Sequence, residues 1–211
     1  MIDRAKHISQ REGIVFILSA PSGTGKTTLV KGLRTIYPDI RLSISFTTRR
    51  RRPGETPGRD YNFVPSATFV TMKRRGDFAE WAKVHDFFYA TPRRPLDECV
   101  RRGRDILLDI DVQGARKIKR KYPQAVSIFL LPPSWHELQR RLALRGTDGK
   151  DTIRRRLVNA RDEIREIIKY DYFVVNREVK TAVELLKSIV EAERAKTARV
   201  KRWRIEPLRR P

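Results

Sequence analysis

One nine-residue stretch constrains the fold more than any other, because it needs a buried strand before it and a helix after it. The stretch is A-P-S-G-T-G-K-T-T, residues 20–28, and it follows the apolar run I-V-F-I-L-S. A loop that approaches phosphate closely needs small residues such as Gly23 and Gly25, followed by a helix N-terminus with its positive partial charge. In this spacing we expect Lys26 to reach the β- and γ-phosphates and the Thr27 hydroxyl to bind Mg²⁺. The loop therefore predicts the use of ATP.

Apolar, β-branched runs alternate with helical patterns along the rest of the chain. This alternation predicts an α/β fold of the P-loop NTPase type, with a parallel sheet core and helices on both faces. Strands are expected at residues 14–19, 42–47, 105–111, 125–131 and 172–176, and helices at residues 26–36, 135–145 and 181 to about 199. Ligands are expected at the carboxyl ends of the strands.

Two regions fit the alternation poorly. Residues 48–92 contain Pro-Gly turns and aromatic side chains, Trp81 and the run Phe87, Phe88 and Tyr89, and they predict an inserted lobe in which Phe87 and Phe88 pack and Tyr89 is a ligand. Residues 141–165 are arginine-rich and helical, which predicts a mobile cover. The expected boundaries are a core at about 12–44, 93–132 and 168–195, a lobe at about 45–92, a lid at about 133–167, and a basic tail at about 195–211.

The charge balance predicts an anionic partner. Lys and Arg number 47 against 25 acidic residues, which gives a net charge of +22. The single cysteine, Cys99, suits a reducing compartment, since it has no internal disulfide partner. No apolar run reaches membrane-spanning length, and the first residues lack the apolar core of a signal peptide. We therefore expect a cytoplasmic protein without a membrane segment.

Four consecutive arginines, residues 49–52, are the most concentrated positive charge in the sequence. They are consistent with a nucleic-acid patch, a solvated charge run, or a clamp for a small anion. Phosphoryl transfer between two polyanions needs cations on the donor, the acceptor and the transition state. Guanidinium forks suit phosphate better than lysine does. Arginines outside the phosphate loop are therefore candidates for the site, with Arg50 and Arg51 expected to be solvated.

The segment T-T-R-R-R-R-P-G-E-T-P-G-R-D-Y resembles the substrate-binding signature of guanylate kinases, T-T-R-x-P-R-x-G-E-x-x-G-x-D-Y. Further similar pieces follow in family order: F-A-E-W-A, L-D-I-D-V-Q-G, L-P-P-S, R-L-A-L-R-G and D-Y-F-V-V-N. The resemblance extends from Gly13 to about Arg194. It implies transfer of the γ-phosphoryl group of ATP to GMP, giving ADP and GDP, with Mg²⁺ as cofactor, an inserted GMP-binding lobe and a helical lid.

The resemblance also implies roles for individual residues. The ATP-binding positions are Ala20, Pro21, Ser22, Gly23, Thr24, Gly25, Lys26, Thr27, Thr28 and Asn176, with Thr27 on Mg²⁺ through ATP. The GMP-binding positions are Ser45, Arg49, Arg52, Tyr61, Glu80, Tyr89, Thr91 and Asp111. The catalytic positions are Lys26, Arg49, Asp109, Arg141, Arg145 and Arg156. Glu80 matches the carboxylate that accepts from guanine N1 and the exocyclic amine, and a carboxylate pairs poorly with the different edge of adenine.

Departures from the family pattern keep other functions open. Asp86 and Phe87 stand where Gly-Asn is usual, and Ala90 replaces a glycine, so dGMP or another phosphorylated small molecule is an alternative acceptor. A binding module that has lost catalysis is a second alternative, opposed by the intact G-T-G-K-T loop. The basic tail, with eight Lys/Arg against one Glu in residues 194–211, leaves weak, nonspecific nucleic-acid binding as a third.

Overall fold

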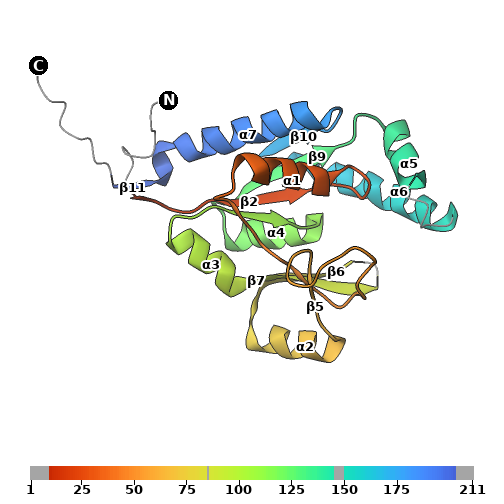
Figure 1. The fold of residues 1–211 in the computed structure, drawn as a ribbon, viewed down its shortest axis with the longest axis horizontal. Coiled ribbons are helices and arrows are strands. Elements are labelled where there is room, and N and C mark those ends of the chain that lie inside the picture. Colours follow the sequence, from red (N-terminus) through yellow and green to blue (C-terminus); the bar gives the residue numbers. More distant parts are fainter. Residues whose placement is uncertain (1–9, 85, 145–149, 203–211) are drawn as a thin grey trace, which may run out of the picture.

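The computed structural model describes residues 10–84, 86–144 and 150–202. Figure 1 shows a central sheet with helices on both faces, a smaller sheet with its own helix below it, and two helices at the end opposite the termini. None of the helices within these ranges combines the length and apolar character needed to cross a lipid bilayer.

Within the described ranges the chain forms eleven strands and seven α-helices, numbered in chain order. The strands are β1 (Gln10–Arg11), β2 (Val15–Ser19), β3 (Arg41–Leu42), β4 (Phe46–Thr47), β5 (Asn62–Phe63), β6 (Phe78–Val84), β7 (Phe87–Pro92), β8 (Ile106–Asp109), β9 (Val126–Leu131), β10 (Tyr172–Val175) and β11 (Val200–Arg202). The helices are α1 (Lys26–Ile36), α2 (Ser66–Arg75), α3 (Arg93–Arg101), α4 (Val112–Lys121), α5 (Trp135–Ala143), α6 (Lys150–Arg165) and α7 (Val179–Ala195), with 3₁₀ turns at Glu166–Lys169 and Thr197–Arg199.

The core sheet has five strands in the order β10-β9-β2-β8-β3. All neighbouring pairs are parallel, with Leu18 opposite Asp109 between β2 and β8, and Phe16 opposite Val126 between β2 and β9. Because the strands run in one direction, their carboxyl ends meet at one edge of the sheet, where ligands bind in such folds. The predicted α/β fold is confirmed.

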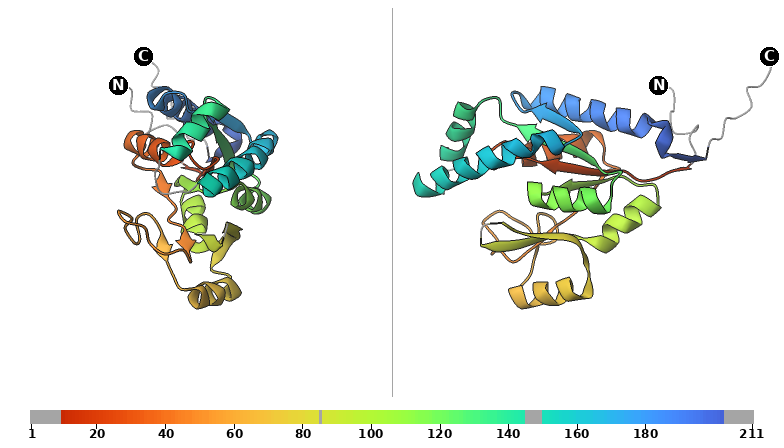
Figure 2. Two further views of the ribbon diagram at one scale, coloured as in Figure 1. Left: turned by 90° about the vertical axis from the view of Figure 1, so that its right-hand side faces the viewer. Right: turned by 180° about the vertical axis from the view of Figure 1, so that it is seen from behind.

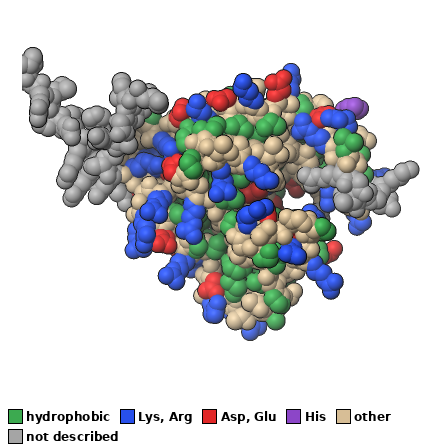
Figure 3. Space-filling view, viewed as in Figure 1, with side chains coloured by type: hydrophobic (Ala, Val, Ile, Leu, Met, Phe, Trp, Pro, Cys, Tyr) green, Lys and Arg blue, Asp and Glu red, His purple; other side chains and the backbone are tan. Residues whose placement is uncertain are grey.

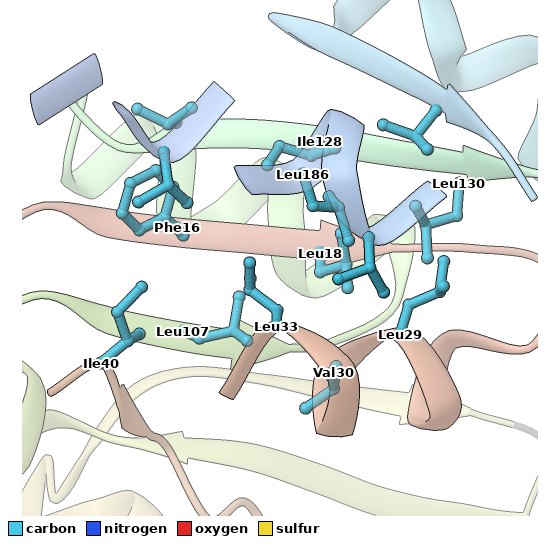
Figure 4. Packing of buried hydrophobic residues seen from close by; sticks show 14 of the residues in the cluster. Phe16, Leu18, Leu29, Val30, Leu33, Ile40, Leu107, Ile128, Leu130 and Leu186 are labelled. Atoms are coloured by element: carbon cyan, nitrogen blue, oxygen red, sulfur yellow. The ribbon is translucent and has the colours of Figure 1, made fainter. Parts of the chain in front are cut away.

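Both faces of the central strand β2 are buried. Phe16 and Leu18 pack toward α1 and α7, where Leu186 of α7 joins them (Figure 4). Val15 and Ile17 point to the opposite face and pack in the cluster that α3 and α4 cover. This two-sided burial explains why β2 is a continuous apolar run rather than an alternating one. Each such side chain contributes about 2 kcal/mol of burial free energy.

The single strand predicted at residues 42–47 is wrong. The chain instead forms two short strands that belong to different sheets, β3 in the core and β4 in the smaller sheet. Ser43 N still bonds the carbonyl of Leu107 in the core, whereas the carbonyl of Ser45 accepts from Asn62 N in the lobe. The change of hydrogen-bonding partner within two residues is what ends one strand and starts the next.

The smaller sheet has the order β5-β4-β7-β6 and is packed against α2. Phe69 of α2 contacts Phe78, with ring centroids 4.8 Å apart, and stacks on Phe88 at 5.3 Å. Phe88 therefore packs as predicted. The prediction for Phe87 is wrong, because its side chain is 38% exposed at the start of β7.

The predicted helices differ from the observed ones mainly at their ends. α1 has the predicted bounds, α5 ends at Ala143, and α7 begins two residues earlier than predicted and ends at Ala195. α5 and α6 pack through Leu138, Leu142 and Ala160. Residues 203–211, the end of the predicted basic tail, lie outside the described residues.

A buried carboxylate, Asp105, holds both ends of the described chain against the core. It accepts from Arg11 at 2.5 and 2.8 Å, from Arg194 Nε at 2.7 Å and from Ile14 N at 2.9 Å. Burial acts to raise its pKa, but the hydrogen bonds and the charge of Arg11 bring that pKa below the usual aspartate value. Nearby, β1 and β11 pair antiparallel, so the two ends of the described chain lie side by side.

We expect Asp105→Ala to lower the free energy of unfolding by about 2–4 kcal/mol, because it leaves two guanidinium groups and an amide without their buried acceptor. The stabilisation is present above the unfolded aspartate pKa and is lost as pH falls through the lowered folded pKa. Urea denaturation measures it. The control is Asp39→Ala, which removes the 62% exposed partner of the same Arg194 and should cost less than about 1 kcal/mol. Equal losses in both variants would contradict the assignment.

Candidate functional site

The loop between β2 and α1 has the backbone shape that phosphate binding requires. Gly23 and Gly25 both have φ of 94°, in the left-handed region that only glycine adopts without strain. A Cβ on Gly25 would lie 2.6 Å from Nδ2 of Asn176, so a larger residue would also clash with the end of β10. The first turn of α1 then presents the exposed side chains of Thr27 and Thr28.

Two residues distant in sequence hold the tip of this loop. The buried amide of Asn176 donates to the carbonyl of Thr24 at 2.7 Å, and Arg141 of α5 donates to the same carbonyl at 3.2 Å. Arg141 is itself aligned by Glu137, whose Oε1 lies 2.7 Å from the Arg141 Nε. The structure thus brings Asn176 and Arg141, two of the predicted site residues, to the loop.

Lys26 joins the loop to the neighbouring strand β8. Its Nζ lies 2.7 Å from Oδ1 of Asp109 and donates to the carbonyl of Ile110 at 3.1 Å. The Asp109 side chain is 32% exposed, so this ion pair is open to a ligand at the carboxyl edge of the sheet. A phosphate arriving at the loop would meet the lysine here.

A second cationic cluster lies in the lobe around Arg49, which is only 8% exposed. Glu55 accepts from both terminal nitrogens of Arg49, at 2.7 and 3.0 Å, and these hydrogen bonds raise the pKa of the guanidinium. The guanidinium carbon stands 5.4 Å from the ring centre of Tyr61, and the rings of Tyr61 and Tyr89 are 5.9 Å apart. Three of the four predicted phosphate ligands are therefore together.

The two clusters face each other. Burial raises the pKa of Tyr61 well above its ordinary value, and the charge of Asp109 raises it further, which places the lobe tyrosine near the Lys26–Asp109 pair of the core. The space-filling view shows a hollow between the core and the lobe with acidic side chains inside it, and Lys and Arg side chains on the surrounding surface (Figure 3).

The fourth predicted phosphate ligand, Arg52, is not part of the cluster. Its side chain is exposed, like those of Arg50 and Arg51, and its backbone N–H donates to Glu55 at 2.8 Å. Glu55 therefore braces the Pro-Gly turn and aligns Arg49 at the same time. The charge run consists of one buried arginine and three exposed ones.

The most unusual group in the lobe is the carboxylate of Glu80, which is 6% exposed. Its Oε1 accepts from the hydroxyl of Thr91 at 2.8 Å, whereas its buried Oε2 has no hydrogen-bond partner among the described residues. Helix α4 approaches it closely, since a Cβ on Gly114 would lie 3.1 Å from Oε2. Burial raises the pKa of Glu80 to about 7; the Thr91 hydrogen bond opposes this rise, and the charge of Asp111 adds to it.

Ser45 and Asp111, the other residues predicted to bind the base, differ in their surroundings. Ser45 is 8% exposed where the chain passes from the core into the lobe. Asp111 is the N-cap of α4 and accepts from Gly114 N at 2.9 Å, so it has a structural role beside any ligand role. Its charge acts on Glu80, which places the two carboxylates near each other.

Helix α6 contributes a second predicted arginine, besides Arg141 of α5, and one acid that sequence reasoning missed. Arg156 lies half-buried on α6, and Arg145 lies outside the described residues. Glu163, seven residues after Arg156 and so on the same helix face, has its pKa raised to about 7 by burial, with the charge of Lys26 opposing this rise. The seven-residue spacing from a predicted site arginine was the available signal.

Comparison with known proteins settles the family. The sequence model of the guanylate kinase family matches residues 12–193. The chain belongs to the guanylate kinase family. It is 53% identical over 192 residues to a guanylate kinase of Syntrophotalea carbinolica, covering 91% of both chains, and 52% identical over 191 residues to one of Geobacter metallireducens, covering 90% of this chain and 94% of the relative.

A solved structure supports the same relationship. The crystal structure of guanylate kinase from Anaplasma phagocytophilum is similar to this fold with a TM-score of 0.77 and 35% identity, over 90% of both chains. The guanylate kinase family resemblance seen in the sequence is thus confirmed for almost the entire described chain.

Because Glu80 is buried, we expect the substitution Glu80→Gln to raise the stability of the protein by an amount that depends on pH. Between the unfolded glutamate pKa near 4.5 and the folded value of about 7, the native state binds the extra proton, so wild-type stability falls as pH rises through this window. We expect the stability of Glu80→Gln relative to wild type to increase by up to about 3 kcal/mol from pH 4.5 to pH 8. Thermal or urea unfolding at both pH values measures the difference. A pH-independent difference would contradict the shifted carboxyl.

Proposed function

We propose that this guanylate kinase family member transfers the γ-phosphoryl group of ATP to GMP and releases ADP and GDP. One observation carries the choice of acceptor: the buried carboxylate of Glu80 has one oxygen held by Thr91 and one without a partner among the described residues. A buried acceptor without a hydrogen bond lowers the stability of the fold. Guanine offers two adjacent donors, N1–H and the 2-amino group, that would supply the missing hydrogen bond. Adenine has no such pair on that edge.

The donor would bind along the loop of residues 20–28. The backbone N–H groups of the loop and the N-terminus of α1 would cradle the phosphates, and Lys26 would contact the β- and γ-phosphates. Asn176, which fixes the loop carbonyl of Thr24, is proposed to lie on the adenine side. Arg141 donates to the same carbonyl, which supports its proposed role at the donor phosphates.

The acceptor would bind in the lobe. Arg49, Tyr61 and Tyr89 are proposed to hold its phosphate, with Arg52 joining from its exposed position. Glu80 would read the guanine together with the buried Ser45 and Thr91 and the partly buried Asp111.

The geometry suits an in-line transfer between the two clusters. Lys26 would neutralise charge on the transferring group, and the lid arginines Arg141, Arg145 and Arg156 would stabilise the charge that develops in the transition state. Oxygen donors are the ligands that Mg²⁺ prefers, and the exposed Thr27 hydroxyl and the Asp109 carboxylate both fit this preference. When bound with ATP, Mg²⁺ would supply further neutralisation of the phosphates.

We further infer a functional division of the chain. The core would comprise residues of about 12–44, 93–132 and 168–195, the acceptor lobe about 45–92, and the lid about 133–167. Closure of lobe and lid would exclude water and so limit ATP hydrolysis. A cytoplasmic location stays a prediction based on the nucleotide substrates and the single cysteine. Use of dGMP and weak nucleic-acid binding by the basic tail also stay predictions.

The choice of acceptor is tested by ADP formation with Mg·ATP and each of GMP, dGMP, IMP and AMP. We expect GMP to be preferred over IMP, which lacks the 2-amino group, and over AMP. In Glu80→Gln, kcat/KM for GMP should fall about 10²-fold or more, because the replacement amide can no longer accept from both guanine donors. Thr91→Val, which removes only the neighbouring hydroxyl, should cost less. Retention of the full GMP preference in Glu80→Gln would refute the assignment.

The arginine run offers a matched test of the phosphate clamp. Arg49→Met removes the buried guanidinium, and Arg51→Met removes an exposed one two residues away. We expect the first to lower kcat/KM for GMP by about 10²-fold or more, while the second changes it by less than about twofold. Steady-state kinetics at fixed ionic strength gives both values. Similar losses would show that the run acts through its net charge alone.

A further inference from the structure

A third cationic cluster lines a pocket where the lobe meets the core, away from both phosphate clusters. It is an open pocket of about 430 Å³, and its charged lining is Lys73, Glu80, Arg93 and Lys117. Neither the loop residues nor the Arg49 cluster lines it. Lys73 comes from α2 of the lobe, Lys117 from α4 of the core, and Arg93 from the start of α3. Helix α4 lies directly over the sheet of the lobe (Figure 2).

The cations of this pocket lack carboxylate partners. Among the described residues, no acidic side chain forms an ion pair with Lys73, Arg93 or Lys117. The single acid in the lining, Glu80, is 6% exposed and bound by Thr91. Three positive charges therefore face one buried carboxylate, an arrangement that attracts an anion.

Arg93 contributes to the pocket a hydrogen-bond donor that has no acceptor among the described residues. One of its terminal nitrogens donates to the carbonyl of Phe78 at 3.1 Å, but its Nε is buried and has no hydrogen-bond partner in the described part of the chain. The positive charge of Arg93 also acts on its surroundings, because it adds to burial in lowering the pKa of Lys121. A buried guanidinium donor without an acceptor costs free energy, which a bound anion would recover.

The two lysines are positioned by an aromatic ring rather than by acids. Lys73 Nζ lies 3.6 Å from the ring centre of Trp81, and Lys117 Nζ lies 4.9 Å from it and donates to the Trp81 carbonyl. Cation–π contacts hold an ammonium without neutralising it. Both ammonium groups therefore keep their full charge and can donate further hydrogen bonds to a ligand.

We propose that this pocket is a third anion site, which binds inorganic phosphate or the phosphate group of a small metabolite through Lys73, Arg93 and Lys117. The bound anion would bridge the lobe and the core directly behind Trp81, the residue that follows Glu80 in β6. Binding at this pocket does not depend on phosphoryl transfer, so its test is separate from that of the proposed function.

The indole N–H signal of Trp81 is the probe, since the ring lies against both lysines. The chain has three tryptophans, so a tryptophan-labelled protein gives a simple ¹⁵N spectrum in which Trp81→Phe identifies the signal. Inorganic phosphate is titrated at constant ionic strength against chloride, with saturating ADP and GMP present to fill the nucleotide sites. We expect a saturable shift of the Trp81 signal with phosphate and none with chloride.

Variants then assign the site. Lys73→Met, which removes an exposed cation, should raise the half-saturating phosphate concentration about tenfold. The double variant Lys73→Met/Lys117→Met should abolish the shift. Lys83→Met, an exposed lysine on the same strand that does not line the pocket, should leave it unchanged. The absence of a saturable shift, or the same shift in Lys73→Met, would overturn the proposal.

Discussion

The lobe is organised around a carboxylate that is buried with half of its hydrogen-bonding capacity unmet. Glu80 has a single protein partner, Thr91, among the described residues, and α4 approaches it so closely at Gly114 that a larger residue would crowd its free oxygen. Such a group lowers stability, and a fold keeps it when a ligand supplies the missing donors. We propose that guanine is the ligand that offsets the free-energy cost of burying Glu80.

The phosphate chemistry follows from the parallel sheet. Because β2 and β8 end at the same edge, Lys26 after one strand meets Asp109 at the end of the other. The lobe then adds Tyr61 and Arg49 on the opposite side of this ion pair. Phosphoryl transfer needs cations at both phosphates, and this arrangement has one set on the core and the other on the lobe.

The sequence correctly predicted the elements whose conformation is set by their own local sequence pattern. The G-T-G-K-T loop and α1 belong to this group. The ligand role that the family resemblance implies for Glu80 stays a prediction. Prediction from the sequence failed where tertiary pairing overrode the local pattern: residues 42–47 are uniformly strand-like, yet their hydrogen bonds change from one sheet to another. Arg52 and Glu163 could not be placed from sequence, because the exposure of one and the burial of the other depend on Glu55 and on the packing of α6.

The most direct test of this account is the titration of the Glu80 carboxyl by ¹³C NMR in protein labelled at the glutamate side chains, with Glu80→Gln to identify the signal. In the free protein the carboxyl should titrate with a pKa of about 7. With GMP bound, two donors would stabilise the charged form, and the pKa should fall well below that value. A carboxyl that titrates near the ordinary glutamate value in the free protein, or one that GMP leaves unshifted, would contradict the account.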